Sequence, residues 1–196
     1  MKTLVFLATL IVNFLAGGAN AIDFTPRFTN TIDDGFPSRR LYFTDGTRRI
    51  YYRPPNTWAP SGDDLAVAFR PKDSKTALIK FENGPAGAAG IAFDERGLEM
   101  FRKVAATLMP PGATDVTQTW EVVNPIILQG WTSFEVGFDY VHSGQLFCRS
   151  VVFINLDAKR QIRVIVDTVP ADFQLLYKTA YRTLATWWEP APGAGP

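Results

Sequence analysis

The segment Leu146–Leu156 constrains the fold most, because apolar residues occupy both its odd and its even positions. Successive side chains of a β-strand point to opposite faces of the sheet. A strand with this pattern therefore has both faces covered, as in sheets that lie between two layers. We expect Leu146–Leu156 to be a central strand buried from both sides.

The segments on either side of this strand predict its neighbours in the sheet. In Trp131–Val141, four apolar residues alternate with Glu135, Gly137 and Asp139, which predicts a strand with one buried and one polar face. After Leu156, the polar turn Asp157–Arg160 leads into the apolar run Ile162–Val169. The three runs together predict an antiparallel meander.

Two segments have helical periodicity. Asp94 is a candidate N-cap for a helix that reaches about Leu108, and Pro110-Pro111-Gly112 ends it. A second helix begins at Pro170-Ala171-Asp172, and its apolar residues follow helical spacing. These are Phe173, Leu176, Tyr177, Ala180, Tyr181, Leu184 and Trp188. Such a stripe must pack on the sheet, so the fold class is α+β: an antiparallel β-sheet sandwiched between helices, with the C-terminal amphipathic helix docked on it.

The first half of the chain adds shorter strands. Asp45-Gly46 separates two β-rich runs and predicts a hairpin, with further strands at Leu65–Phe69 and Ala77–Phe81. We interpret residues 22–38 as an extended leader, residues 39–188 as a single α+β domain and residues 189–196 as a flexible tail.

The N-terminus has the features of a secretory signal peptide. Lys2 precedes an apolar run from Leu4 to Leu15, and Ala19-Asn20-Ala21 is a small-residue cleavage signal. The apolar run is shorter than the roughly 20 residues of a membrane-spanning helix. We expect cleavage after Ala21 and a protein that is secreted or periplasmic, with no membrane span in its mature form.

The charge balance and the scarcity of His and Cys exclude several kinds of site. Residues 1–21 hold Lys2 as their only charge, so the remaining 175 residues carry 19 basic and 19 acidic side chains. A neutral chain has no general attraction for nucleic acid, and we expect no nucleic-acid partner. The chain has one His and one Cys, too few for an internal disulfide or a Cys-rich zinc site.

No catalytic constellation stands out, so the sequence predicts no catalytic residue, no metal site and no cofactor. His142 is a turn residue, and Cys148 lies in the apolar central strand, where we expect it to be buried. The loop Gly84–Gly90 lacks the Gly-Lys-Ser/Thr ending of a phosphate-binding loop. A hydrolase with Glu121 and Glu135 as paired carboxylates across two strands remains a third hypothesis.

The first hairpin carries the candidate binding surface. With Asp45-Gly46 as the turn, Tyr42 lies opposite Arg49 and Arg40 lies opposite Tyr51, all on one side. Alternating guanidinium groups and phenol rings suit an anionic or sugar-bearing ligand. Alternatively, these side chains only cover one another on a half-exposed strand.

The order of these elements resembles the PsbP-like fold, which is shared by an extrinsic photosystem II protein, a Ran-binding nuclear-import regulator and bacterial exported proteins. The resemblance runs from Leu41 to Trp188. It rests on Ile50-Tyr51-Tyr52 followed by Pro54-Pro55-Asn56-Thr57-Trp58, on Leu108–Ala113, on Asn124-Pro125-Ile126 before the meander, and on the closing helix Asp172–Trp188. It implies a sheet between helical layers and members that are assembly and binding factors rather than enzymes.

From these observations we expect an exported, non-catalytic accessory protein that acts through contacts with a protein partner in the envelope or the extracellular space. The alternative is a module that binds a small ligand or a polysaccharide through the aromatic and Arg residues of the first hairpin.

Overall fold

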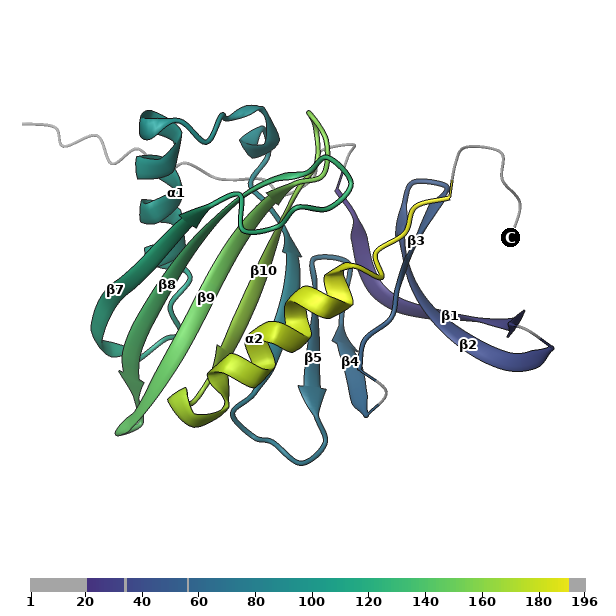
Figure 1. Cartoon of the computed structure of the whole chain (residues 1–196), viewed down its shortest axis with the longest axis horizontal. Coiled ribbons are helices and arrows are strands. Elements are labelled where there is room, and N and C mark those ends of the chain that lie inside the picture. Colours follow the sequence, from purple (N-terminus) through teal and green to yellow (C-terminus); the bar gives the residue numbers. More distant parts are fainter. Residues whose placement is uncertain (1–20, 34, 56, 191–196) are drawn as a thin grey trace, which may run out of the picture.

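The computed structural model describes residues 21–33, 35–55 and 57–190. The predicted signal peptide and most of the predicted tail lie outside these residues. Seven strands form the main antiparallel sheet, in the order β4-β5-β6-β10-β9-β8-β7 (Figure 1). Their bounds are Trp58–Gly62 (β4), Ala66–Pro71 (β5), Leu78–Asn83 (β6), Thr114–Val123 (β7), Thr132–His142 (β8), Gln145–Asn155 (β9) and Gln161–Thr168 (β10). The predicted meander is confirmed as β8, β9 and β10.

Helices cover both faces of this sheet, as the apolar pattern of Leu146–Leu156 predicts. Six consecutive residues of β9, Arg149–Ile154, are buried. Helix α1 (Glu95–Thr107) packs on one face, where Phe101 meets Phe153 of β9, and a short 3-10 turn at Ala88–Gly90 precedes it. Helix α2 (Pro170–Leu184) lies across the opposite face (Figure 1). The predicted sandwich of helices around an antiparallel sheet is therefore confirmed.

The start of α1 follows a local sequence signal, whereas the end of α2 is set by a contact with a distant part of the chain. The Asp94 side chain caps α1 by accepting a hydrogen bond from the Gly97 N–H. The sequence predicts that the last helix continues to Trp188, but α2 ends at Leu184. Beyond it, Trp188 forms a β-bridge with Tyr51, so the chain leaves the helix to join another sheet.

That second sheet is the main feature that the sequence analysis misses. Strands β1 (Asp23–Asp33), β2 (Phe36–Asp45) and β3 (Arg48–Tyr52) form a separate antiparallel sheet. Residues 22–38 are therefore not a leader ahead of the fold, because β1 pairs with β2 and Phe24 is fully buried against Phe43. The outer parts of β1 and β2 extend away from the main sheet as an arm (Figure 1). We define this arm as Arg27–Asp33 with Phe36–Arg40.

The first hairpin forms, but its register differs from the predicted one. Asp45 pairs with Arg48, so the two turn residues are Gly46 and Thr47 rather than Asp45 and Gly46. Gly46 has a φ of 59°, and a positive φ at the first central position is typical of a type II′ turn. Moving the turn by one residue changes each cross-strand partner by two positions, which preserves the face on which every side chain lies.

The polar face of β8 is also not exposed as predicted. Glu135 is fully buried beneath α2, and its two carboxyl oxygens accept hydrogen bonds from Tyr177, Tyr181, Ser150 and Trp120 at 2.7–3.1 Å. Gly137 makes room for the Trp120 indole, because a Cβ at Gly137 would lie 1.9 Å from that ring. Two helix residues and two sheet residues thus converge on one carboxyl group.

This arrangement predicts a large cost for removing Glu135. Glu135→Ala leaves four donors without their acceptor, and we expect the free energy of unfolding to fall by about 3–5 kcal/mol. Tyr181→Phe removes one donor and is expected to cost about 1–2 kcal/mol. Urea unfolding followed by circular dichroism measures both. Leu175→Ala on the exposed side of α2 is the control, and an equal loss there would contradict this assignment.

Candidate functional site

A groove of about 830 Å³ lies at the junction of the arm, the start of β4 and the segment that follows α2. Three arginines line it: Arg39 and Arg40 from β2, and Arg53 just beyond β3. The aromatic residues of the lining are Phe28, Tyr51, Tyr52, Trp58 and Trp188. Among the described residues that line the groove there is no Asp or Glu, so the groove combines positive charge with apolar rings.

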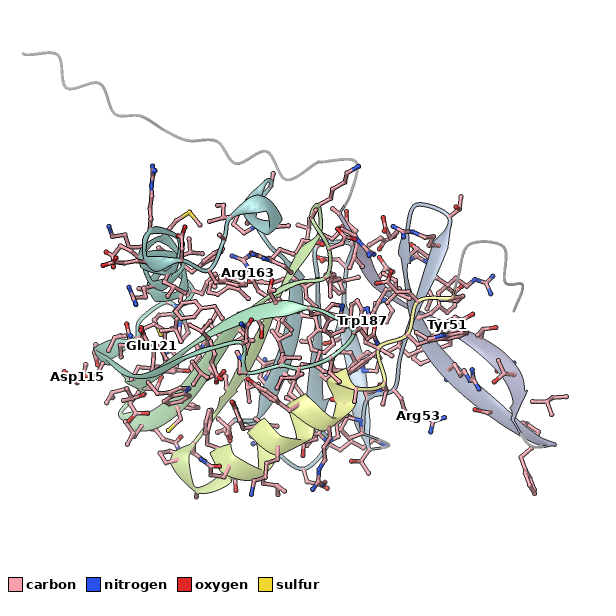
Figure 2. The ribbon with its side chains drawn as sticks, turned by 45° about the horizontal axis from the view of Figure 1, so that its top comes forward. Tyr51, Arg53, Asp115, Glu121, Arg163 and Trp187 are labelled. Atoms are coloured by element: carbon pink, nitrogen blue, oxygen red, sulfur yellow. The ribbon has the colours of Figure 1, made fainter. Side chains whose placement is uncertain are left out.

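The prolines that follow β3 and the segment that follows α2 contribute to this groove. Pro54 and Pro55 end β3, and the chain returns at Trp58 as the first residue of β4. The Arg53 N–H donates to Thr186 Oγ1 at 2.9 Å, which ties the end of β3 to the segment after α2. Figure 2 shows Tyr51 and Arg53 beyond Trp187, on the side of the three-stranded sheet.

The floor of the groove is closely packed. Tyr52 is 2% exposed, its ring packs against Phe69 and Phe81, and its hydroxyl donates to Thr183 Oγ1 at 2.7 Å. Burial raises the pKa of Tyr52 well above its ordinary value, so this hydroxyl remains protonated at physiological pH. The floor therefore contributes an apolar surface and no charge.

The rim is more open. Trp188 is 50% exposed and lies against Tyr51, with ring centroids 5.2 Å apart. Two backbone hydrogen bonds between Tyr51 and Trp188, at 2.9 and 3.0 Å, hold this pair of rings in place. On the arm, the Arg39 guanidinium carbon lies 3.7 Å from the centroid of the Phe28 ring. A ligand in the groove would thus meet a fixed ring pair at one end and a cation stacked on a ring at the other.

The four residues that the sequence analysis selects lie on one face of the three-stranded sheet. Tyr42 is opposite Tyr51, with ring centroids 6.0 Å apart, and the Arg49 guanidinium carbon lies 5.0 Å from the Tyr42 centroid. The predicted pairs, Tyr42 with Arg49 and Arg40 with Tyr51, are replaced by the shifted register. Arg40 and Tyr51 line the groove, whereas Tyr42 and Arg49 are not among its lining residues. The binding role of all four stays a prediction.

Sequence reasoning misses several groove residues. Arg39 is adjacent to the selected Arg40, and Arg53 continues the alternation of Arg49 and Tyr51. The hairpin pattern could therefore have identified both residues. The sequence predicts Trp188 to be part of the last helix, because it continues the helical spacing of that segment. Only its β-bridge to Tyr51, a contact distant in sequence, brings it to the groove.

The structure separates the two carboxyl groups of the hydrolase hypothesis. Glu121 of β7 pairs with Val136 and binds Arg102 of α1, with Nε to Oε2 at 2.7 Å. Glu135 directly precedes Val136 in β8, so its side chain points to the opposite face of the sheet, where it accepts hydrogen bonds from Tyr177 and Tyr181 of α2. The sheet lies between the two carboxyl groups, and the paired arrangement expected of a glycosidase is wrong for these residues.

The remaining reactive side chains have structural surroundings. His142 ends β8 beside a two-residue turn, Ser143-Gly144, in which both φ angles are positive as in a type I′ turn. Asp63 accepts hydrogen bonds from the N–H groups of Leu65 and Ala66 and so shapes a loop. The described part of the chain contains no group of three His, Cys, Asp or Glu residues placed to hold a metal ion. Within it, no helix is both long and apolar enough to span a membrane.

Comparisons with known proteins give structural likenesses only. No family model matches the chain, and none of the curated proteins matches it. PA94 from Pseudomonas aeruginosa, a protein of unknown function, is 12% identical, covers 85% of this chain and 99% of its own, and has a TM-score of 0.47. LpqN of Mycobacterium tuberculosis, involved in cell envelope biogenesis, is 14% identical over 86% of this chain and 94% of its own, with a TM-score of 0.45.

A cyanobacterial PsbP from Synechocystis is also similar in structure, with 10% identity over 88% of this chain and 94% of its own and a TM-score of 0.41. It carries the name of the fold family that the sequence resembles.

The reactivity of the Cys148 thiol tests how strongly its surroundings raise its pKa. It is half-buried, and burial, together with the nearby carboxyl group of Asp139, raises the pKa of its thiol to about 12. Because the thiolate is the reactive form, we expect slow alkylation by iodoacetamide even at about pH 9, where an ordinary thiol is largely ionised. Mass spectrometry should show rapid labelling only after unfolding in urea. Equally fast labelling of the folded protein would contradict the raised pKa.

Proposed function

We propose that this chain is an exported, non-catalytic accessory protein whose groove binds an acidic, extended segment of a protein partner. The observation that carries the proposal is the lining of the groove: three arginines and five aromatic residues, with no carboxylate among the described lining residues. The signal-peptide features of residues 1–21 support export, which places the partner in the envelope or the extracellular space.

The three arginines favour an anionic ligand. Guanidinium groups form paired, charge-assisted hydrogen bonds with carboxylates, and these bonds are stronger than those between neutral groups. Arg39 and Arg40 line the groove from opposite faces of β2, and Arg53 lines it from just beyond β3, so a bound segment that carries several carboxylates meets more than one cation along its length. The described lining residues include no Asp or Glu, whose negative charge would repel an anionic ligand.

The other lining residues favour a peptide over a sugar chain. Grooves that bind extended, proline-rich peptides are lined by aromatic rings. Here Trp58, Tyr51 and Trp188 are combined with Pro54, Pro55 and Pro60. Asn, Gln, Asp and Glu, whose side chains pair with sugar hydroxyls, are absent from the described lining. A polysaccharide ligand, the alternative from the sequence analysis, is therefore an outcome for the experiment to exclude.

Binding of a labelled peptide tests this function. The probe is a fluorescein-labelled extended peptide in which Glu alternates with Phe and Pro, and anisotropy measures its Kd. We expect Arg53→Ala to raise Kd about tenfold or more, because it removes a charge-assisted contact worth about 1.5–3 kcal/mol. The matched control is Arg96→Ala, which removes an exposed arginine from α1. Raised salt should weaken wild-type binding.

A heparin-derived oligosaccharide is the competing probe. If the oligosaccharide binds and the peptide does not, the protein-partner proposal is wrong. If Arg96→Ala weakens peptide binding as much as Arg53→Ala does, the attraction is unspecific and the groove is not the site.

A further inference from the structure

Pro26 and a register shift between Asp23 and Arg27 interrupt the first part of β1, but from Arg27 to Asp33 its edge lacks the features that protect the edges of β3, β4 and β7. The outer edge of β3 bonds to Trp188. β4 has only five residues and includes Pro60, and β7 has two register shifts and a φ of 51° at Asp115. Short strands, prolines and bulges are the usual protections of an edge. By contrast, Arg27–Asp33 pairs with β2 in a continuous register, and no charged residue stands between Phe28 and Ile32.

The sequence of this edge is symmetric about Asn30. Thr29 and Thr31 flank Asn30, the apolar residues Phe28 and Ile32 come next, and Arg27 and Asp33 have opposite charges at the two ends. When two identical strands pair antiparallel with Asn30 at the centre, each residue of one half lies opposite its counterpart in the other half. A strand with this symmetry is self-complementary.

We propose that two copies of this chain pair through their β1 edges, antiparallel, about a twofold axis at Asn30. In this register Phe28 lies opposite the partner's Ile32 and Thr29 lies opposite the partner's Thr31. Pairs of an aromatic with a β-branched residue and pairs of two threonines are cross-strand pairs that stabilise antiparallel sheets. No like charges face each other.

The exposure of the arm agrees with this arrangement. Ile32 is 77% exposed and Phe28 is 40% exposed, although both are large and apolar. They lie on the same face of β1, because they are four residues apart in a strand. Pairing covers Phe28 with the partner's Ile32 twice, once on each side of the axis, as expected of an interface that uses the same surface on both copies.

This interface shares Phe28 with the groove but uses none of the three groove arginines. Phe28 does line the groove, so the partner's Ile32 would extend the apolar lip there. The dimer would therefore present two grooves, and each copy retains its own Arg39, Arg40 and Arg53. Failure of the dimer leaves the proposed ligand site intact, and failure of ligand binding leaves the dimer intact.

Sedimentation equilibrium with edge variants tests the proposal. We expect a wild-type dimer, and we expect Asn30→Lys to raise the dimer Kd by about tenfold or more, because two lysines then meet at the axis and edge lysines oppose pairing. An equimolar mixture of Asn30→Lys and Asn30→Glu should regain the wild-type Kd. Asn30 is exposed, so neither change disturbs the core.

Thr119→Lys is the matched control, because Thr119 is an exposed residue of β7, the edge of the main sheet. It should leave the wild-type dimer unchanged. As a second measurement, Asn30→Cys should form a disulfide-linked dimer under mild oxidation and Thr119→Cys should not. A wild-type protein that remains monomeric up to about 1 mM overturns the proposal. So does a dimer that tolerates Asn30→Lys, or one that Thr119→Lys dissociates.

Discussion

The rest of the structure depends on Trp187, which is buried where the two sheets meet (Figure 2). Its ring lies 6.2–6.3 Å, between centroids, from those of Phe43 of the three-stranded sheet, Phe81 of the main sheet and Trp131. Gln129 donates to its backbone oxygen at 2.7 Å. One indole thus joins the core of both sheets, and its position fixes the next residue, Trp188, at the rim of the groove.

A cluster of ion pairs around the buried Arg160 supports the same junction. Arg160, which is 9% exposed, bonds to Asp45 of the first hairpin at 3.2 Å, to Glu189 after α2 at 3.0 Å and to Asp157 at 2.6 Å. The Glu189 carboxyl also accepts the Trp187 indole N–H at 3.2 Å. The start of the predicted flexible tail is therefore anchored. Buried pairs of this kind contribute little net free energy when complete, but their loss leaves an uncompensated charge. Their effect here is to fix how the two sheets are arranged.

Local patterns predict the parts of this fold that depend on neighbours in sequence. The apolar run at Leu146–Leu156 and the capping residue Asp94 were sufficient for the central meander and α1. Patterns failed where distant contacts decide: Glu135 looks solvent-facing in an alternating strand, yet the tyrosines of α2 bury it. Likewise, Trp188 keeps helical spacing but bonds to Tyr51. The hairpin pattern predicts one face of Arg and Tyr residues but not the groove, because Trp58 and Trp188 reach the groove from other segments.

The proposed binding of an acidic segment in the groove between the arm and β4 is tested most directly by an NMR titration of the ¹⁵N-labelled protein with the peptide in which Glu alternates with Phe and Pro. We expect the largest shifts on the backbone amides of Tyr51, Arg53 and Trp188 and on the indole N–H of Trp188, while the amides of α1 stay unchanged. Shifts concentrated on α1 or β7, or spread evenly over the surface, would contradict it.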